Sequence, residues 1–208
     1  MVKRIVLLMV AVTILGMGAG LTLTAAIGVG AWDAFATTLS NLTMIEIGTC
    51  GMILNITCVL IQYLILKKGF TFKHLLQIPF SILLGVVINF MFYNVSAYIP
   101  TDTYLQRLVV LTLGTVIAAY SVSFIMTLNF ITLALEGACV AVEKVTKIKF
   151  HILRQYVDII SIVVVFIITF ITKTDLPIRE GTIIGMIIFG PLIGFFGKYN
   201  QKILNKVI

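Results

Sequence analysis

Long apolar runs alternate with short polar segments along the chain. Windows of about 20 apolar residues, the length that crosses a bilayer as a helix, lie at roughly 5–27, 46–66, 74–97, 108–130, 152–172 and 181–197. We therefore expect an all-α membrane protein with six transmembrane helices. The first run is about twice as long as the apolar core of a signal peptide, so we expect it to remain as the first span.

The composition agrees with this pattern. Of the 208 residues, 60% are hydrophobic and only 11% are charged, and the mean hydropathy is +1.14. A soluble core of this size could not enclose so much apolar surface, so the expected partner of most of the chain is the lipid bilayer. The net charge of +7 comes from short basic clusters between apolar runs, which argues against a nucleic-acid partner.

The basic residues fall mainly on one side of the expected spans. If the N-terminus is cytoplasmic, only Arg107, Lys173 and Arg179 lie outside. The other twelve of the fifteen lie inside, and they are Lys3, Arg4, Lys67, Lys68, Lys73, Lys144, Lys147, Lys149, Arg154, Lys198, Lys202 and Lys206. The positive-inside rule then predicts a multi-pass protein with both termini in the cytoplasm.

The end of the first apolar run combines glycines, the only tryptophan and an acid: Gly28, Gly30, Trp32 and Asp33. An ionisable group near membrane depth is costly, so it indicates a functional site, and glycine lets the backbone turn beside it. Alternatively, Trp32 is an interfacial anchor and Asp33 lies in water beyond it. The segment 31–43 is too short and polar to span, so it is either re-entrant or a helix at the outer surface.

The second half of the chain repeats this arrangement. Glu136 again places an acid beside a glycine at the end of an apolar run, and adding 103 to the residue number takes Asp33 to Glu136 and Asn55 to Asp158. Three spans fall in each half. An odd number of spans turns the second copy upside down in the membrane, as in many secondary transporters.

We therefore expect one membrane domain made of two inverted three-helix repeats, residues 1–103 and 104–208. The stretches 28–35 and 134–139 are the corresponding helix interruptions. In transporters of this design, solute sites lie at the repeat interface and are built by interrupted helices.

Other polar residues within the spans are candidates for lining a path. Asn55 lies in the second span and Asn89 in the third, while Arg154 and Asp158 lie one helical turn apart in the fifth. Interhelical hydrogen bonds are the alternative explanation for the amides. An Arg154–Asp158 pair would also neutralise both charges without any solute.

Small residues mark two of the spans. Gly16 and Gly20 have GxxxG spacing, which permits close helix packing within the chain or against a partner protein. The sixth span contains Gly185, Gly190, Pro191 and Gly194, which predict a broken or closely packed helix.

Sequence patterns of catalysis are missing. The chain has no phosphate-binding loop, nucleophile elbow, zinc-protease motif or dinucleotide fingerprint. Its cysteines form no disulfide framework or metal-ligand spacing, and its two histidines lie beside lysines at the expected cytoplasmic boundary; these residues are Cys50, Cys58, Cys139, His74 and His151. We expect no enzyme activity, no cofactor and no metal.

The run Gly28-Val29-Gly30-Ala31-Trp32-Asp33, followed by Ile47-Gly48-Thr49, resembles a segment of the YczE/YyaS/YitT group of bacterial integral membrane proteins. Ala31 stands where that group commonly has proline. The resemblance implies a bacterial cytoplasmic-membrane protein and points to Gly28, Gly30, Trp32, Asp33 and Gly48. It implies no defined activity, because the group is considered transporter-like mainly for its architecture.

Together these features predict a transporter of a small solute, with Asp33 and Glu136 as paired acids and with protons as the natural coupling ion. The alternative is a non-transporting membrane accessory, or a substrate-binding subunit driven by a partner protein. The sequence leaves open the solute, the direction of transport and the oligomeric state, for which a homodimer and a complex with another membrane protein are both compatible.

Overall fold

The structure, a computed structural model, describes residues 2–207, without the side chains of 203 and 205–207. Lys206, one of the expected inner cations, therefore lies outside the described side chains. Every regular element in the described part is helical. The elements are α1 (Val2–Ala25), α2 (Ala31–Thr43), α3 (Ile47–Leu66), η1 (Lys67–Gly69), α4 (Phe72–Leu75), α5 (Gln77–Asn89), η2 (Phe90–Val95), η3 (Ser96–Tyr98), α6 (Tyr104–Leu128), α7 (Ala134–Thr146), α8 (Phe150–Thr172) and α9 (Glu180–Val207).

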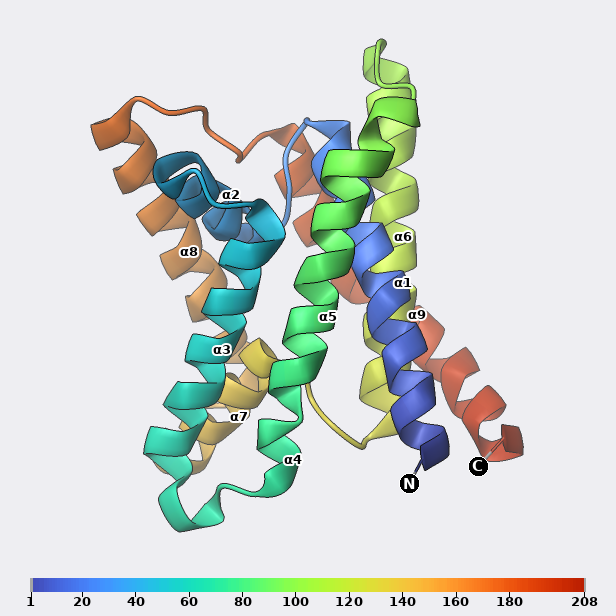
Figure 1. Cartoon of the computed structure of the whole chain (residues 1–208). Helices are drawn as coiled ribbons and strands as arrows, with labels where there is room; N and C mark the ends of the chain where they lie inside the picture. The colour runs from blue at the N-terminus through green and yellow to red at the C-terminus, as the bar shows by residue number, and fades with distance from the viewer. Residues whose placement is uncertain (1, 208) are drawn as a thin grey trace.

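Six of the helical segments are long and apolar enough to cross a bilayer. They are Val2–Ala25, Ile47–Gly69, Phe72–Tyr98, Tyr104–Leu128, Phe150–Thr172 and Glu180–Lys202. These segments overlap the six apolar windows one for one, which confirms an all-helical chain of the multi-pass membrane type. The two termini lie at the same end of the bundle (Figure 1).

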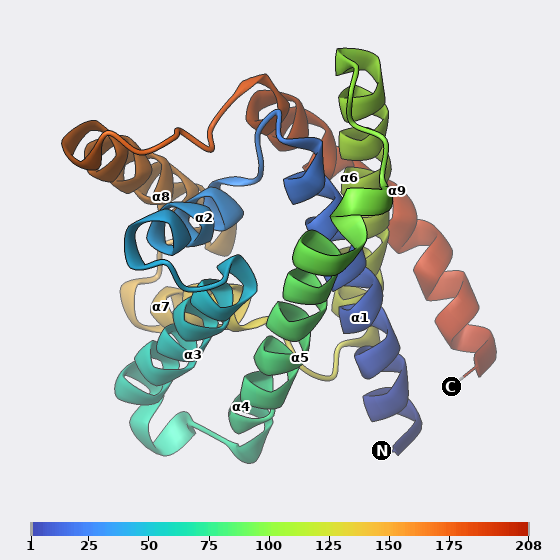
Figure 2. The ribbon, with the colours of Figure 1, turned by 45° about the horizontal axis from the view of Figure 1, so that its top comes forward.

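The helices form two neighbouring groups. α1 packs against α5 and α6, and α6 packs against α9. On the other side, α3 packs against α7, α2 lies against α3 and α8, and α7 contacts α8 (Figures 1 and 2). The contact between α3 and α5 joins the two groups.

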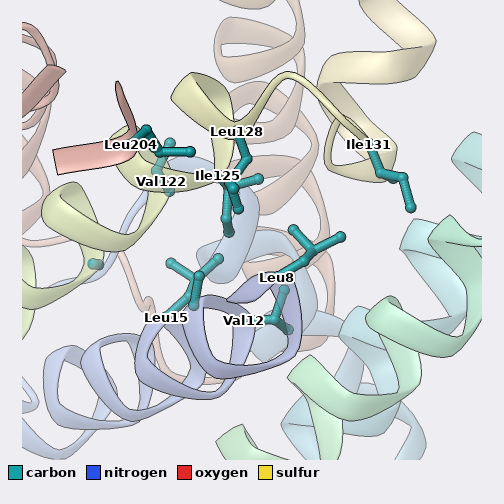
Figure 3. Packing of buried hydrophobic residues seen from close by; sticks show 10 residues of the cluster. Leu8, Val12, Leu15, Val122, Ile125, Leu128, Ile131 and Leu204 are labelled. Atoms are coloured by element: carbon teal, nitrogen blue, oxygen red, sulfur yellow. The ribbon is translucent and has the colours of Figure 1, made fainter. Parts of the chain in front are cut away.

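The core of the first group lies between the antiparallel helices α1 and α6. Leu8, Val12 and Leu15 of α1 point toward Val122 and Ile125 of α6 (Figure 3). Small residues bring the two backbones together further along. A Cβ built on Gly18 would lie 2.7 Å from the nitrogen of Ala118 and 2.8 Å from the oxygen of Gly114.

The GxxxG face of α1 is used inside the chain. A Cβ on Gly16 would lie 2.8 Å from Val87, and one on Gly20 would lie 2.4 Å from Cβ of Met91. Both contacts are with the third span, in α5 and in the π-helical turn η2 that follows it. The expectation of packing within the chain is confirmed for this face, and the alternative of a docking surface for a partner is wrong because α5 already covers it.

The two short helices α2 and α7 correspond closely. Each has 13 residues with one acid in its first turn, Asp33 and Glu136 respectively. Helix starts recur 103 residues apart, for Ala31 and Ala134, Ile47 and Phe150, and Gln77 and Glu180. Left-handed residues recur at the same spacing, at Ala26 and Asn129 and at Met44 and Lys147.

The sixth span differs from its expected form. α9 runs without interruption from Glu180 to Val207, with Pro191 inside it. A Cβ built on Gly185, Gly190 or Gly194 would meet no atom within 4 Å. These glycines therefore mark neither a break nor close packing among the described residues, because they lie on faces of α9 that no other described helix covers.

Candidate functional site

The first break in the helices positions Asp33. Gly28 has a φ of +114°, which side-chain-bearing residues rarely adopt, and this turns the chain between α1 and α2. The nitrogen of Ala34 then donates to the oxygen of Gly30 at 2.7 Å as α2 begins. Asp33 therefore lies in the first helical turn, where the helix dipole favours a negative charge.

The start of α9 holds this break in place. The nitrogen of Gly181 donates to the oxygen of Ile27 at 2.7 Å, and Nη1 of Arg179 donates to the oxygen of Ala26 at 3.1 Å. A Cβ on Gly28 would lie 2.8 Å from the nitrogen of Thr182. The first break is thus attached to a helix of the second half of the chain.

Trp32 packs within the protein. Its ring meets Phe35 edge-on, with centroids 6.2 Å apart, and lies against a buried cluster that includes Cys58 of α3 and Ala138 of α7. Its Nε1 is buried without a hydrogen-bond partner. The neighbours of the indole are therefore other helices of the chain, and the alternative in which Trp32 is an interfacial anchor stays a prediction.

The second break brings together Glu136, Arg154 and Asp158. Nε of Arg154 lies 3.7 Å from Oε1 of Glu136, and Nη1 of the same side chain donates to Oδ1 of Asp158. All three side chains are about a quarter exposed. The expected Arg154–Asp158 pair is confirmed, and the guanidinium also joins α8 to the first turn of α7.

Asp33 belongs to the same electrostatic group. Burial raises the pKa of Asp33 to about 6, while the positive charge of Arg154 opposes this rise and the negative charge of Asp158 adds to it. The structure therefore couples Asp33 with Arg154 and Asp158, although no ion pair joins them. We call Asp33, Glu136, Arg154 and Asp158 the charged cluster.

The two asparagines lie outside this arrangement. Asn89 caps the start of α3, where its Oδ1 accepts from the nitrogen of Gly48 at 2.6 Å and its Nδ2 donates to Glu46 at 2.6 Å. Gly48 permits this approach, since a Cβ there would lie 2.5 Å from Asn89. Asn55 is half-buried on α3 and makes no hydrogen bond among the described residues.

Two buried glutamines complete the surroundings of the second break. Gln62 of α3 and Gln77 of α5 bond to each other and reach the first turn of α7. Gln62 stands out in the sequence as an amide within an apolar span. Gln77 carries the same signal near the start of the third apolar window, but its pairing with Gln62 depends on how α3 and α5 lie against each other and against α7.

The metal-binding residue types are dispersed. Within residues 2–207, no group of three or more His, Cys, Asp or Glu side chains is arranged to hold a metal ion. His74 bonds to Thr71 in a local capping box and stacks on Phe70. The three cysteines are free and buried.

Comparison with known proteins gives a family without an assigned activity. The model of the Family of unknown function (DUF6198) matches residues 2–198, which is nearly the whole chain. No curated protein and no solved structure matches. The resemblance to the YczE/YyaS/YitT group stays a prediction.

Proposed function

Because this chain belongs to the Family of unknown function (DUF6198), its activity must be inferred from its own site, and we propose that it is a transporter of a small solute. The observation that carries this proposal is the charged cluster. In it, ion pairs join Arg154 to Glu136 in the first turn of α7 and to Asp158, and Asp33 in the first turn of α2 interacts electrostatically with Arg154 and Asp158. Ionisable groups that meet at helix breaks within a bundle of apolar helices lower the stability of the protein. Their presence therefore indicates a functional site.

The charge balance of the cluster favours a cationic or zwitterionic solute. The cluster has three carboxylates and one guanidinium, and Arg154 is already paired with Glu136 and Asp158. Asp33 is left without an ion pair, and Nε1 of the preceding residue, Trp32, is buried without a hydrogen-bond partner. A ligand with a positive group for Asp33 and an acceptor for the indole would suit both.

Asp33 is also the residue through which we propose that transport is coupled to protons. A pKa of about 6 for Asp33 lets the carboxyl exchange its proton near neutral pH. A solute cation and a proton would then compete for one carboxylate. This competition is the simplest way to link movement of one to movement of the other.

The proposed architecture is a pair of inverted repeats, with α2 and α7 as re-entrant or interfacial interruptions. The recurrence of helix starts 103 residues apart supports it, as do the equal lengths of α2 and α7. Each repeat would contribute three spans, so that the two breaks approach the site from opposite sides. In a bacterial cytoplasmic membrane, both termini would lie inside, in keeping with their position at one end of the bundle (Figure 1).

Ligand-induced stabilisation tests the proposal without assuming that transport occurs. The purified protein is heated with a panel of small metabolites at several pH values, because a ligand that binds the folded state raises the melting temperature by mass action. Asp33→Asn should abolish the rise for a true ligand. The matched control is Asp102→Asn, which makes the same change at an exposed turn outside the charged cluster.

Reconstitution separates the transporter from the accessory protein. Vesicles of pure protein should take up the stabilising solute, and Asp33→Asn should stop uptake while the protein stays folded. A ligand that binds but is not moved would indicate a substrate-binding subunit of a larger machine. If no metabolite stabilises the wild type at any pH, the proposed solute site is wrong.

A further inference from the structure

Two glutamine side chains form a buried, paired contact near the turn that joins α3 to α5. Nε2 of Gln62 donates to Oε1 of Gln77 at 2.7 Å and to the main-chain oxygen of Ala134 at 3.0 Å. Nε2 of Gln77 donates back to Oε1 of Gln62 at 3.2 Å. Gln62 is 0% exposed and Gln77 is 3% exposed. We call this contact the amide clasp.

The amide clasp holds the turn that carries Glu136. Gly137 allows the contact, because a Cβ on it would lie 2.7 Å from Oε1 of Gln62 and 2.9 Å from Nε2 of Gln77. Glu136 precedes Gly137 in the chain and meets Arg154. Movement of this turn away from the clasp would therefore move one acid of the charged cluster.

The amide clasp exists at one end of the molecule only. Adding 103 to the two positions gives Val165 and Glu180, which cannot form a pair of amides. At the other break, the attachment is made by the main chain, from Gly181 to Ile27. Gln62 lies in the C-terminal part of α3, the end of the helix that leads to Lys67, so the clasp is on the side of the basic loop and the termini (Figure 1).

We propose that the amide clasp is the gate on this side of the charged cluster. It is closed in this structure, and it opens when the first turn of α7 leaves α3 and α5, which lie against it (Figure 2). Paired amides suit a gate because water can replace their hydrogen bonds on opening at little net cost, whereas separated apolar side chains would have no such replacement. This inference rests on the transport function proposed above.

The native cysteines report on the gate. Cys58 of α3 lies in the buried cluster beside the clasp, together with Ala134 and Ala138 of α7. Cys139, the residue after Ala138 in α7, is also buried. Cys50 is buried at the opposite end of α3, against Thr43 and Ile45. A maleimide reagent with readout by peptide mass spectrometry therefore distinguishes opening at the gate from general loosening within one molecule.

The test variant is Gln62→Glu. The carboxyl keeps the size of the amide but has at most one hydrogen in place of two, so it cannot donate to both Gln77 and Ala134. We expect Cys58 and Cys139 to be labelled about tenfold faster or more, as for a buried contact that loses its hydrogen bonds. Labelling of Cys50 should not change.

Two further variants keep the test decisive. Gly137→Ala separates the same surfaces by inserting a methyl group and should give the same pattern if Gln62→Glu does not fold. Gln155→Glu makes the same amide-to-acid change at an exposed position and should alter no rate. Equal acceleration at all three cysteines, or no acceleration at Cys58 and Cys139, would overturn the gate.

The experiments distinguish failure of the proposed gate from failure of the proposed transport function. Unchanged labelling in a Gln62→Glu protein that still binds an Asp33-dependent ligand overturns the gate alone. Failure of every metabolite to stabilise the wild type overturns the transport function, and the gate with it, whatever the labelling rates. Selective labelling together with an Asp33-dependent ligand supports both.

Discussion

Replacing Gly18 with alanine should weaken the contact between α1 and α6. The added methyl group would lie 2.7 Å from the nitrogen of Ala118 and 2.8 Å from the oxygen of Gly114, whereas ordinary contact begins at 3.4 Å. Both opposing atoms are main chain of α6, so no side chain can rotate away. The two helices must separate, and overpacking of this kind costs about 1–3 kcal/mol.

The free energy of unfolding has a second contribution of opposite sign. Alanine favours a helix over glycine by about 1 kcal/mol. If the steric cost is at the upper end, about 3 kcal/mol, the net loss for Gly18→Ala is about 2 kcal/mol. In a protein of this size, such a loss lowers the melting temperature by roughly 4–8 °C.

Gly185→Ala is the matched control, because it makes the same change inside a helix where a Cβ meets nothing within 4 Å. It should leave the melting temperature unchanged or raise it by roughly 2–4 °C. The assay is thermal unfolding of the purified variants in one detergent at one scan rate. A Gly18→Ala protein as stable as the Gly185→Ala protein would refute the close approach of α1 and α6.

Three other perturbations test separate parts of the site by thermal unfolding. Arg154→Gln should lower the free energy of unfolding by about 1 kcal/mol more than the double change Arg154→Gln with Asp158→Asn, since only the single variant leaves the carboxylate of Asp158 unpaired. Equal losses would mean that the pair does not stabilise the protein. Burial raises the pKa of Asp33 from 3.8 to about 6, so the folded state keeps a proton that the unfolded chain releases. The free energy of unfolding should therefore fall by up to about 3 kcal/mol between about pH 3 and about pH 7. That fall should vanish in Asp33→Asn, and an unchanged pH profile would contradict the burial. Asn89→Leu should lower the free energy of unfolding by about 1–3 kcal/mol, because the nitrogen of Gly48 loses its hydrogen-bond acceptor. A variant as stable as wild type would mean that this cap contributes little to stability.

The sequence predicts the six spans and the Arg154–Asp158 pair well, because each depends only on residues that are close together in the sequence. An apolar window of about 20 residues is sufficient to define a span. Arg154 and Asp158 lie four residues apart on one helix, so their contact follows from helical spacing. The acids at 33 and 136 are also identifiable, because each stands beside glycine at the end of an apolar run.

Long-range contacts are what the sequence does not reveal. Asn89 is predicted to line a path but caps α3, since its role depends on how α5 lies against α3. Gln77 is overlooked for the same reason. Gly185 is predicted to mark a break or close packing, yet a glycine on an uncovered helix face has the same sequence pattern as one in a packed interface.

The attachment of the first break to the start of α9 has a consequence for biosynthesis. Arg179 reaches the oxygen of Ala26 across 153 residues of chain. At about 5–20 residues per second, a ribosome needs roughly 8–30 s to make that length. During this interval the α1–α2 turn is already in the membrane without its final neighbour. The nascent N-terminal half therefore lacks its contacts with α9 while the rest of the chain is made. A protein truncated before α9 should be recognised and degraded by cellular proteases.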